Sequence, residues 1–173
     1  MSQEELEHLL QRLHQDLYGW ALACCRWNKD DALDVLQTAY VRALQGRERM
    51  NGMPGPRAWL FGVIRRTALE HRRRRFLRAL GMSRWQRLVP PPAGPVSPEH
   101  HAEDDEARRR LWRLMSLLSS RQRDLLHLVF YQDMTIEEAA GVLRISVGTA
   151  RVHYDRGKAR LRQLLIQEQA TRP

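Results

Sequence analysis

The stretch TIEEAAGVLRISVGTARVHYDRGKARLRQLL, residues Thr135–Leu165, decides the fold of the C-terminal part of the chain. It contains two segments in which apolar residues recur at helical spacing, separated by a short break at Leu143–Ser146. Thr135 and Glu138 form a T-x-x-E capping box, which predicts the start of a helix. Ser146 is a favourable N-cap for a second helix, so the stretch predicts two helices joined by a turn of three or four residues.

The second of these helices, expected near residues 147–168, has a polar outer face. Val147, Ala150 and Tyr154 are expected to face inward, while the side chains around Arg151 and Arg156 face outward. A tight turn and such an outer face describe a helix-turn-helix, whose second helix enters a DNA major groove. An ordinary helical hairpin with a solvated basic face is the alternative. The expected DNA-contacting residues of this helix are Ser146, Thr149, Arg151, Val152, Asp155, Arg156, Lys158 and Arg160.

The turn itself contains an unusual residue. Arg144 occupies the position at which glycine usually adopts a left-handed backbone, and a residue with a Cβ costs about 1 kcal/mol there. The helix-turn-helix remains the expected fold of this segment, with a turn whose geometry differs slightly.

Charge divides the 173-residue chain into three parts. The formal net charge of +9 is distributed as +5 over residues 1–80, −3 over residues 81–107 and +7 over residues 108–173. The acidic middle part contains VPPPAGPVSPEHHAEDDEA, whose prolines disfavour helix, so it is expected to be a flexible, extended linker. The flanking basic parts lack strand periodicity, and the predicted fold is all-α, with two small helical domains joined by the linker. Helices are expected near residues 3–27, 30–45 and 55–79 in the first domain, and near 103–117, 120–131, 135–143 and 147–168 in the second.

The composition also limits the classes of function. A strongly basic chain suggests a polyanionic partner, either nucleic acid or an acidic membrane surface. No apolar run reaches the length of a membrane-spanning helix, and the acidic N-terminus does not resemble a signal peptide, so we expect a cytoplasmic protein without membrane insertion. The adjacent Cys24 and Cys25 are expected to be buried thiols, and His100 and His101 are weak evidence for a metal. No nucleophile elbow, phosphate loop or zinc spacing occurs, so neither a cofactor nor an enzymatic activity is expected.

Longer motifs resemble a known family. LSSRQRDLLHLVFYQDMTIEEAAGVLRISVGTARVHYDRGKARLRQLL resembles the promoter-reading C-terminal domain of bacterial sigma factors of the extracytoplasmic-function (ECF) group. DDALDVLQTAYVRAL resembles the family's polymerase-gripping helix, and PRAWLFGVIRRTALEHRRRR resembles its helix beside the melted promoter. The resemblance implies a dissociable subunit that lets core RNA polymerase recognise and open promoter DNA, and it implies regulation by an anti-sigma factor.

The resemblance assigns roles in the N-terminal domain, over residues 1–80. Residues Asp31, Asp34, Gln37 and Arg42 are expected to bind the polymerase, although from the sequence alone they are equally well ordinary surface. The loop Gly46–Pro56, with Asn51, is expected to hold a flipped base. Trp59 either stacks on an unstacked base or belongs to the core. Phosphate contacts are expected from Arg65, Arg66, Arg72, Arg73 and Arg74 together with Arg75. A stand-alone helix-turn-helix regulator and a helical adaptor protein are the competing hypotheses, and neither needs the polymerase-gripping helix.

Overall fold

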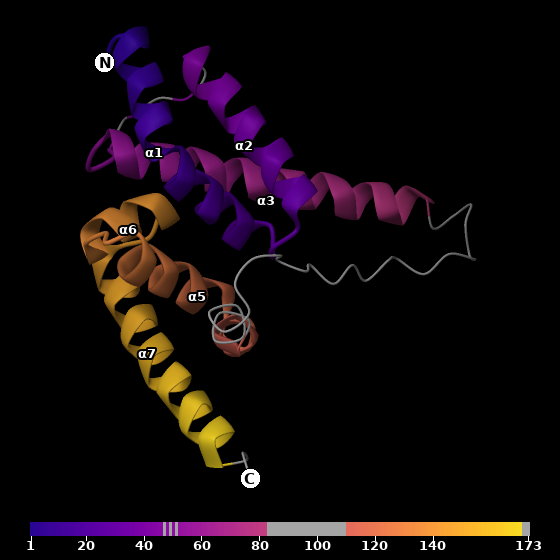
Figure 1. Ribbon diagram of the computed structural model, residues 1–173, viewed down its shortest axis with the longest axis vertical. Helices are drawn as coiled ribbons and strands as arrows, with labels where there is room; N and C mark the ends of the chain where they lie inside the picture. Colours follow the sequence, from indigo (N-terminus) through magenta and orange to yellow (C-terminus); the bar gives the residue numbers. More distant parts are fainter. Residues whose placement is uncertain (47, 49, 51, 83–109, 171–173) are drawn as a thin grey trace. The chain divides into compact units, whose positions relative to one another are not determined.

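The computed structural model describes residues 1–46, 48, 50, 52–82 and 110–170, and every regular element within these ranges is a helix (Figure 1). The chain divides into two units, Met1–Val96 and Ser97–Pro173. The predicted all-α class is therefore confirmed. Almost all of the predicted linker, and the start of the helix expected near 103–117, lie outside the described residues.

The N-terminal unit contains three helices that pack against one another: α1 (Gln3–Cys24), α2 (Lys29–Leu44) and α3 (Pro56–Met82). Figure 1 shows α1 and α2 side by side, with α3 running across them. The core is centred on Trp20, whose indole Nε1–H donates to the Phe61 carbonyl oxygen over 3.0 Å and whose ring stacks on that of Phe61. Because both side chains are fully buried, this contact fixes α3 against α1.

The chain signals the boundaries of α1 and α2 locally. The Ser2 hydroxyl and the Glu5 carboxylate form a capping box at the start of α1. The sequence predicted that this helix continues to residue 27, which is wrong, because Arg26 and Trp27 have φ angles of 53° and 65°. Two consecutive left-handed residues reverse the chain direction, and the Asn28 side chain then caps α2.

Within its described residues, the C-terminal unit contains helical residues 110–116, α5 (Ser120–Leu126), η1 (His127–Tyr131), α6 (Ile136–Leu143) and α7 (Val147–Ala170). A single helix was expected near 120–131, but its last five residues form a π-helical turn. This wider turn is followed by a chain reversal at Asp133, where φ is 46°. One buried cluster of its core consists of leucines and one methionine: Leu114, Met115, Leu118, Leu126 and Leu164.

A glycine allows α7 to approach α5 closely. Gly157 is buried, and a Cβ at this position would lie 3.2 Å from Gln122 Cβ and 3.3 Å from Leu126 Cδ1. These separations are shorter than ordinary carbon–carbon contacts, so only glycine leaves both neighbours undisturbed. Gly157 was not among the residues predicted to be important, although a glycine inside a long helix is itself a signal of close packing.

Candidate nucleic-acid interface

The turn between α6 and α7 has the geometry that a helix-turn-helix requires. Thr135 and Glu138 form the predicted capping box at the start of α6, and the Ser146 hydroxyl accepts from the Thr149 backbone N–H at the start of α7. Arg144 adopts the left-handed conformation expected at that position, with φ 52° and ψ 52°. The Arg121 guanidinium donates to the Leu143 carbonyl oxygen over 3.0 Å, and this bond ties α5 to the end of α6.

The first turns of α7 present their polar side chains to solvent. Ala150 is buried and Tyr154 is partly buried, as the spacing predicted. The exposed residues are Ser146, Thr149, Arg151, Val152, Asp155, Arg156, Lys158 and Arg160. The structure therefore brings all the residues predicted for DNA contact from this helix to an accessible surface.

Two contacts position the basic side chains of this surface. Arg151 Nη2 lies 3.2 Å from Glu137 Oε1 on α6, and both side chains remain more than half exposed. Lys158 Nζ lies 4.9 Å from the centre of the Tyr154 ring, which in turn stacks on Phe130. An exposed ion pair contributes at most about 1 kcal/mol, so Glu137 holds Arg151 in this position only weakly.

The arginines of α3 form a second basic surface, in the N-terminal unit. Arg72, Arg73 and Arg74 are exposed, as predicted. Arg65 is partly buried, and Arg66 forms an ion pair with Glu48 in which both side chains are mostly buried. Arg66 is therefore paired with Glu48 within the chain, and its role in holding phosphate stays a prediction.

Of the two alternatives expected for Trp59, the structure supports the core. The ring is 4% exposed and lies in the core, so it cannot stack on a base in this conformation. The helical spacing of α3 places Trp59 among the buried positions Ala58, Leu60 and Val63, and this packing outweighs its aromatic character. Asn51, the predicted base contact in the preceding loop, lies outside the described residues, as do His100 and His101.

The predicted polymerase-binding set of α2 separates into two groups. Asp34 and Gln37 are exposed, together with the apolar side chains Leu33 and Val41. Asp31 and Arg42 instead contact α3. Asp31 forms an ion pair with Arg75, and Arg42 Nη2 lies 2.6 Å from Glu70 Oε2, with its side chain 20% exposed.

The Arg42–Glu70 ion pair joins α2 to α3. The hydrogen bond from Arg42 holds the pKa of the Glu70 carboxyl below its usual range, and Arg42 also reaches the Thr67 hydroxyl at 3.4 Å. Asp31 and Arg42 are thus engaged by α3 within the chain, and their expected contact with the polymerase stays a prediction. Both side chains have their charged groups satisfied by α3.

The charges of the N-terminal unit are segregated between its helices. Together α1 and α2 carry seven acidic and three basic side chains, whereas α3 carries eight arginines and one glutamate. Two of these acidic side chains, Asp16 and Asp31, are paired with Arg57 and Arg75 of α3. No metal-ligand cluster of three or more His, Cys, Asp or Glu side chains occurs among the described residues.

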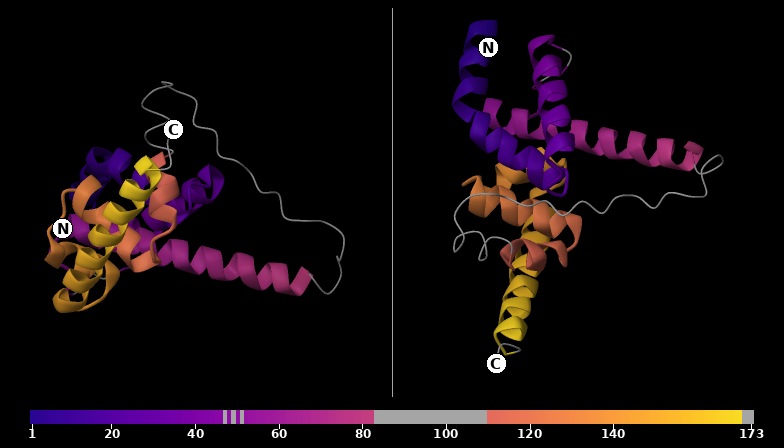
Figure 2. Two further views of the ribbon diagram at one scale, coloured as in Figure 1. Left: turned by 90° about the horizontal axis from the view of Figure 1, so that it is seen from below. Right: turned by 45° about the vertical axis from the view of Figure 1, so that its right-hand side comes forward.

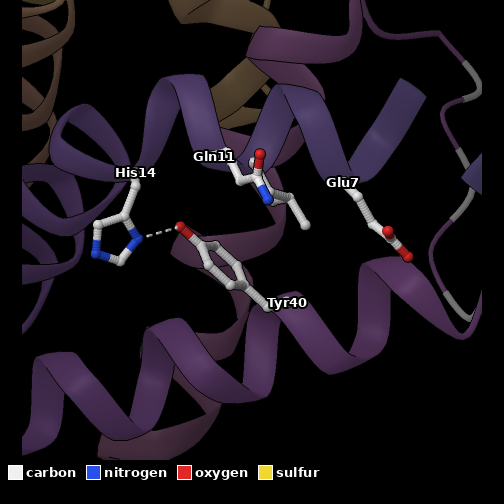
Figure 3. A pocket seen from close by; sticks show the side chains of 5 residues that line it. Glu7, Gln11, His14 and Tyr40 are labelled. Carbon is white, nitrogen blue, oxygen red and sulfur yellow. Dashed lines mark hydrogen bonds between the residues drawn. The ribbon is translucent and has the colours of Figure 1, made fainter. Parts of the chain in front are cut away.

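A groove of about 550 Å³ lies on the acidic helix pair, between α1 and α2. Figure 3 shows Tyr40 extending from α2 toward His14 of α1, and its hydroxyl lies 3.0 Å from His14 Nδ1. Glu7, Leu10 and Gln11 complete the lining. Burial raises the pKa of Tyr40 to about 12, so its hydroxyl stays protonated at neutral pH.

Comparison with known proteins identifies the chain. The model of Sigma-70 region 2 matches residues 9–76, and the model of Sigma-70, region 4 matches residues 108–161. The RNA polymerase sigma-E factor of Streptomyces coelicolor is 32% identical over 137 residues, which cover 79% of this chain and 72% of that protein. The ECF RNA polymerase sigma factor SigX of Bacillus subtilis is 26% identical over 171 residues, which cover 93% and 84%.

Solved structures agree on the fold. The sigma factor RpoE of Bartonella quintana, crystallised with the anti-sigma factor NepR, superposes with a TM-score of 0.72 at 20% identity and covers 94% of this chain and 97% of that one. CnrH, in complex with the cytosolic domain of CnrY, gives a TM-score of 0.64 at 21% identity and covers 96% and 90%.

The two basic helical units and the helix-turn-helix thus define a promoter-binding subunit, and the chain belongs to the sigma-70 family. Within that family it is an ECF-type sigma factor, which binds core RNA polymerase and directs transcription initiation. It is not an enzyme, since the polymerase supplies the chemistry. The stand-alone regulator and the helical adaptor are excluded because the region 2 match covers the N-terminal unit.

Proposed function

We propose that this sigma factor uses opposite sides of its N-terminal unit for its two partners. The arginines of α3 hold the phosphates of the separating promoter strands, and α1 and α2 face the core polymerase. The observation that carries the proposal is the segregation of charge, with net +7 on α3 and net −4 on the other two helices. Phosphate attracts the first surface and repels the second.

The polymerase contact of this proposal is the exposed face of α2. Asp34 and Gln37 supply polar groups, and the exposed Leu33 and Val41 supply apolar area for a partner helix. A basic side chain of that partner has a place in the neighbouring groove, where Glu7 offers a carboxylate and Tyr40 an aromatic face. Asp31 and Arg42 support this surface from behind by tying α2 to α3.

The C-terminal unit reads the upstream promoter element through α7. Arg151 lies in the first turns, the part of a recognition helix that contacts base edges, and its guanidinium suits guanine. Arg156 is also exposed, about one and a half turns further along, and Arg160, beyond it, contacts backbone phosphate only. In this scheme residues 1–80 bind the polymerase and melt the promoter, and residues 108–173 bind the upstream promoter element. Residues 81–107 connect these two domains.

The cellular location of this sigma factor follows from its partner, RNA polymerase. RNA polymerase is a cytoplasmic enzyme in bacteria, so the protein acts in the cytoplasm. Within the described ranges, no helix is long and apolar enough to span a membrane. Two structurally similar proteins were solved with anti-sigma partners, NepR and the cytosolic domain of CnrY, and this likeness supports an anti-sigma factor for the present chain.

The experiment compares two arginines of α7, one expected to contact DNA bases and the other expected to contact backbone phosphate. Holoenzymes with Arg151→Ala and Arg160→Ala are assayed on a panel of promoter variants at several salt concentrations. Arg151→Ala should cost about 1–3 kcal/mol and relax preference at particular bases. Arg160→Ala should weaken all promoters alike and lower the salt slope by about one unit. Uniform loss across the panel with Arg151→Ala would contradict its base-reading role.

A further inference from the structure

The C-terminal half of α3 exposes large apolar side chains that neither the core nor the proposed promoter contacts use. Both views of Figure 2 show this half of the helix continuing past α1 and α2. Phe76 is 64% exposed, Leu77 is 55% exposed and Leu80 is 52% exposed. Exposed residues of this size on successive turns form a contiguous apolar surface, which marks an interaction site.

These side chains lie together on one side of the helix. Leu69, Phe76 and Leu80 are separated by seven and four residues, so they share a stripe, and Leu77 lies beside it. Leu69 is 40% exposed, so the stripe extends over three turns. Around it the helix carries Arg72–Arg75 and Arg78, and the sequence from residue 71 to residue 82 contains no acidic side chain. This half of α3 is therefore a basic amphipathic helix.

We propose that the C-terminal half of α3 adsorbs to an anionic phospholipid surface. The helix lies in the plane of the headgroups, with Phe76, Leu77 and Leu80 in the acyl boundary and the arginines among the lipid phosphates. Arg73, within the apolar stripe, extends its charged end back to the headgroups. This is attachment to a surface, and it requires no membrane-spanning segment.

The distribution of charge favours a membrane over other anionic partners. DNA phosphates neutralise the arginines but leave Phe76 and Leu77 in water. Arg75 is paired with Asp31 of α2, but Arg72, Arg73 and Arg74 point in directions about 100° apart. An acidic partner helix covers the apolar stripe but reaches only one side of α3, and so cannot meet all three. A layer of anionic headgroups meets a half-immersed helix on both flanks at once.

The proposal is tested by flotation of the full chain with vesicles. One set contains phosphatidylcholine only, and in the other set part of it is replaced by phosphatidylglycerol. The wild-type chain should bind the second set only, and added salt should release it. Phe76→Ser combined with Leu77→Ser should lower partitioning about ten-fold. The matched control is Ile166→Ser, which removes an equally exposed apolar side chain from α7 and should leave partitioning unchanged.

Circular dichroism establishes that each variant is folded, because the substituted side chains are on the surface. The proposal is overturned if the wild-type chain does not bind anionic vesicles or binds both sets of vesicles equally. It is also overturned if the double variant binds anionic vesicles as tightly as the wild type does. It is also overturned if the wild-type chain does not bind vesicles and the double variant loses affinity for core polymerase. In that case the apolar stripe is a protein contact. Flotation does not involve transcription, so failure here leaves the sigma-factor function untouched.

Discussion

Protonation of His127 should destabilise the C-terminal unit as the pH falls below about 6.5. The imidazole is 3% exposed and lies between aromatic rings, with the Tyr131 centroid 5.3 Å away and that of Trp112 5.9 Å away. Desolvation by this burial lowers the pKa of His127 from 6.5 to about 4. The unfolded chain therefore binds a proton at a higher pH than the folded chain does.

The size of the effect follows from linkage. Stability contributed by the neutral imidazole is fully present above pH 6.5 and is lost as the pH falls from 6.5 to about 4. A shift of this size corresponds to about 3 kcal/mol in total, of which roughly 1 kcal/mol is lost by about pH 5.5. Urea unfolding of wild type and His127→Phe, at about pH 7.5 and about pH 5.5, measures this loss in the NMR signals of the C-terminal unit.

The comparison isolates one histidine from other titrating groups. His127→Phe keeps a ring between Trp112 and Tyr131, so the carboxylates of the unit titrate in both proteins and cancel in the difference. The wild type should lose roughly 1 kcal/mol more than the variant on acidification. Equal losses in the two proteins, or an imidazole that titrates near 6.5 in the folded state, would show that burial does not control this group.

Three further substitutions test packing and the polymerase surface. Gly157→Val should lower the free energy of unfolding of the C-terminal unit by about 1–3 kcal/mol, measured by chemical denaturation, since α5 must move to admit the side chain. Arg42→Met should destabilise the N-terminal unit by about 1 kcal/mol in the same assay, because Glu70 and Thr67 lose their partner. Asp34→Lys should leave unfolding unchanged and weaken binding to core polymerase, measured by fluorescence anisotropy; unchanged affinity would remove this residue from the interface.

The sequence predicted features that depend on neighbouring residues. The capping box at Thr135 and Glu138, the N-cap at Ser146 and the left-handed Arg144 all occur as expected. Each depends on hydrogen bonds or backbone sterics within four residues, so the local pattern contains the information. The exposed outer face of α7 follows equally from helical spacing.

Roles that depend on distant partners could not be predicted. Arg42 meets Glu70 across 28 residues, and Asp31 meets Arg75 across 44. Helical spacing shows that such residues share a side of a helix, but it does not show whether another helix covers that side. Whether Trp59 is buried could not be predicted either, because its burial depends on how α3 packs against the other two helices. The π-helical turn at the end of α5 likewise has no signal in local spacing.

The central claim is that this chain directs core RNA polymerase to defined start sites. The direct measurement is in vitro transcription of a fragmented genomic template by core polymerase, with and without the chain, followed by sequencing of RNA 5′ ends. The chain should produce a set of discrete 5′ ends that share upstream sequence elements and are absent with core polymerase alone. A chain that binds the polymerase but leaves the distribution of 5′ ends unchanged would contradict the claim.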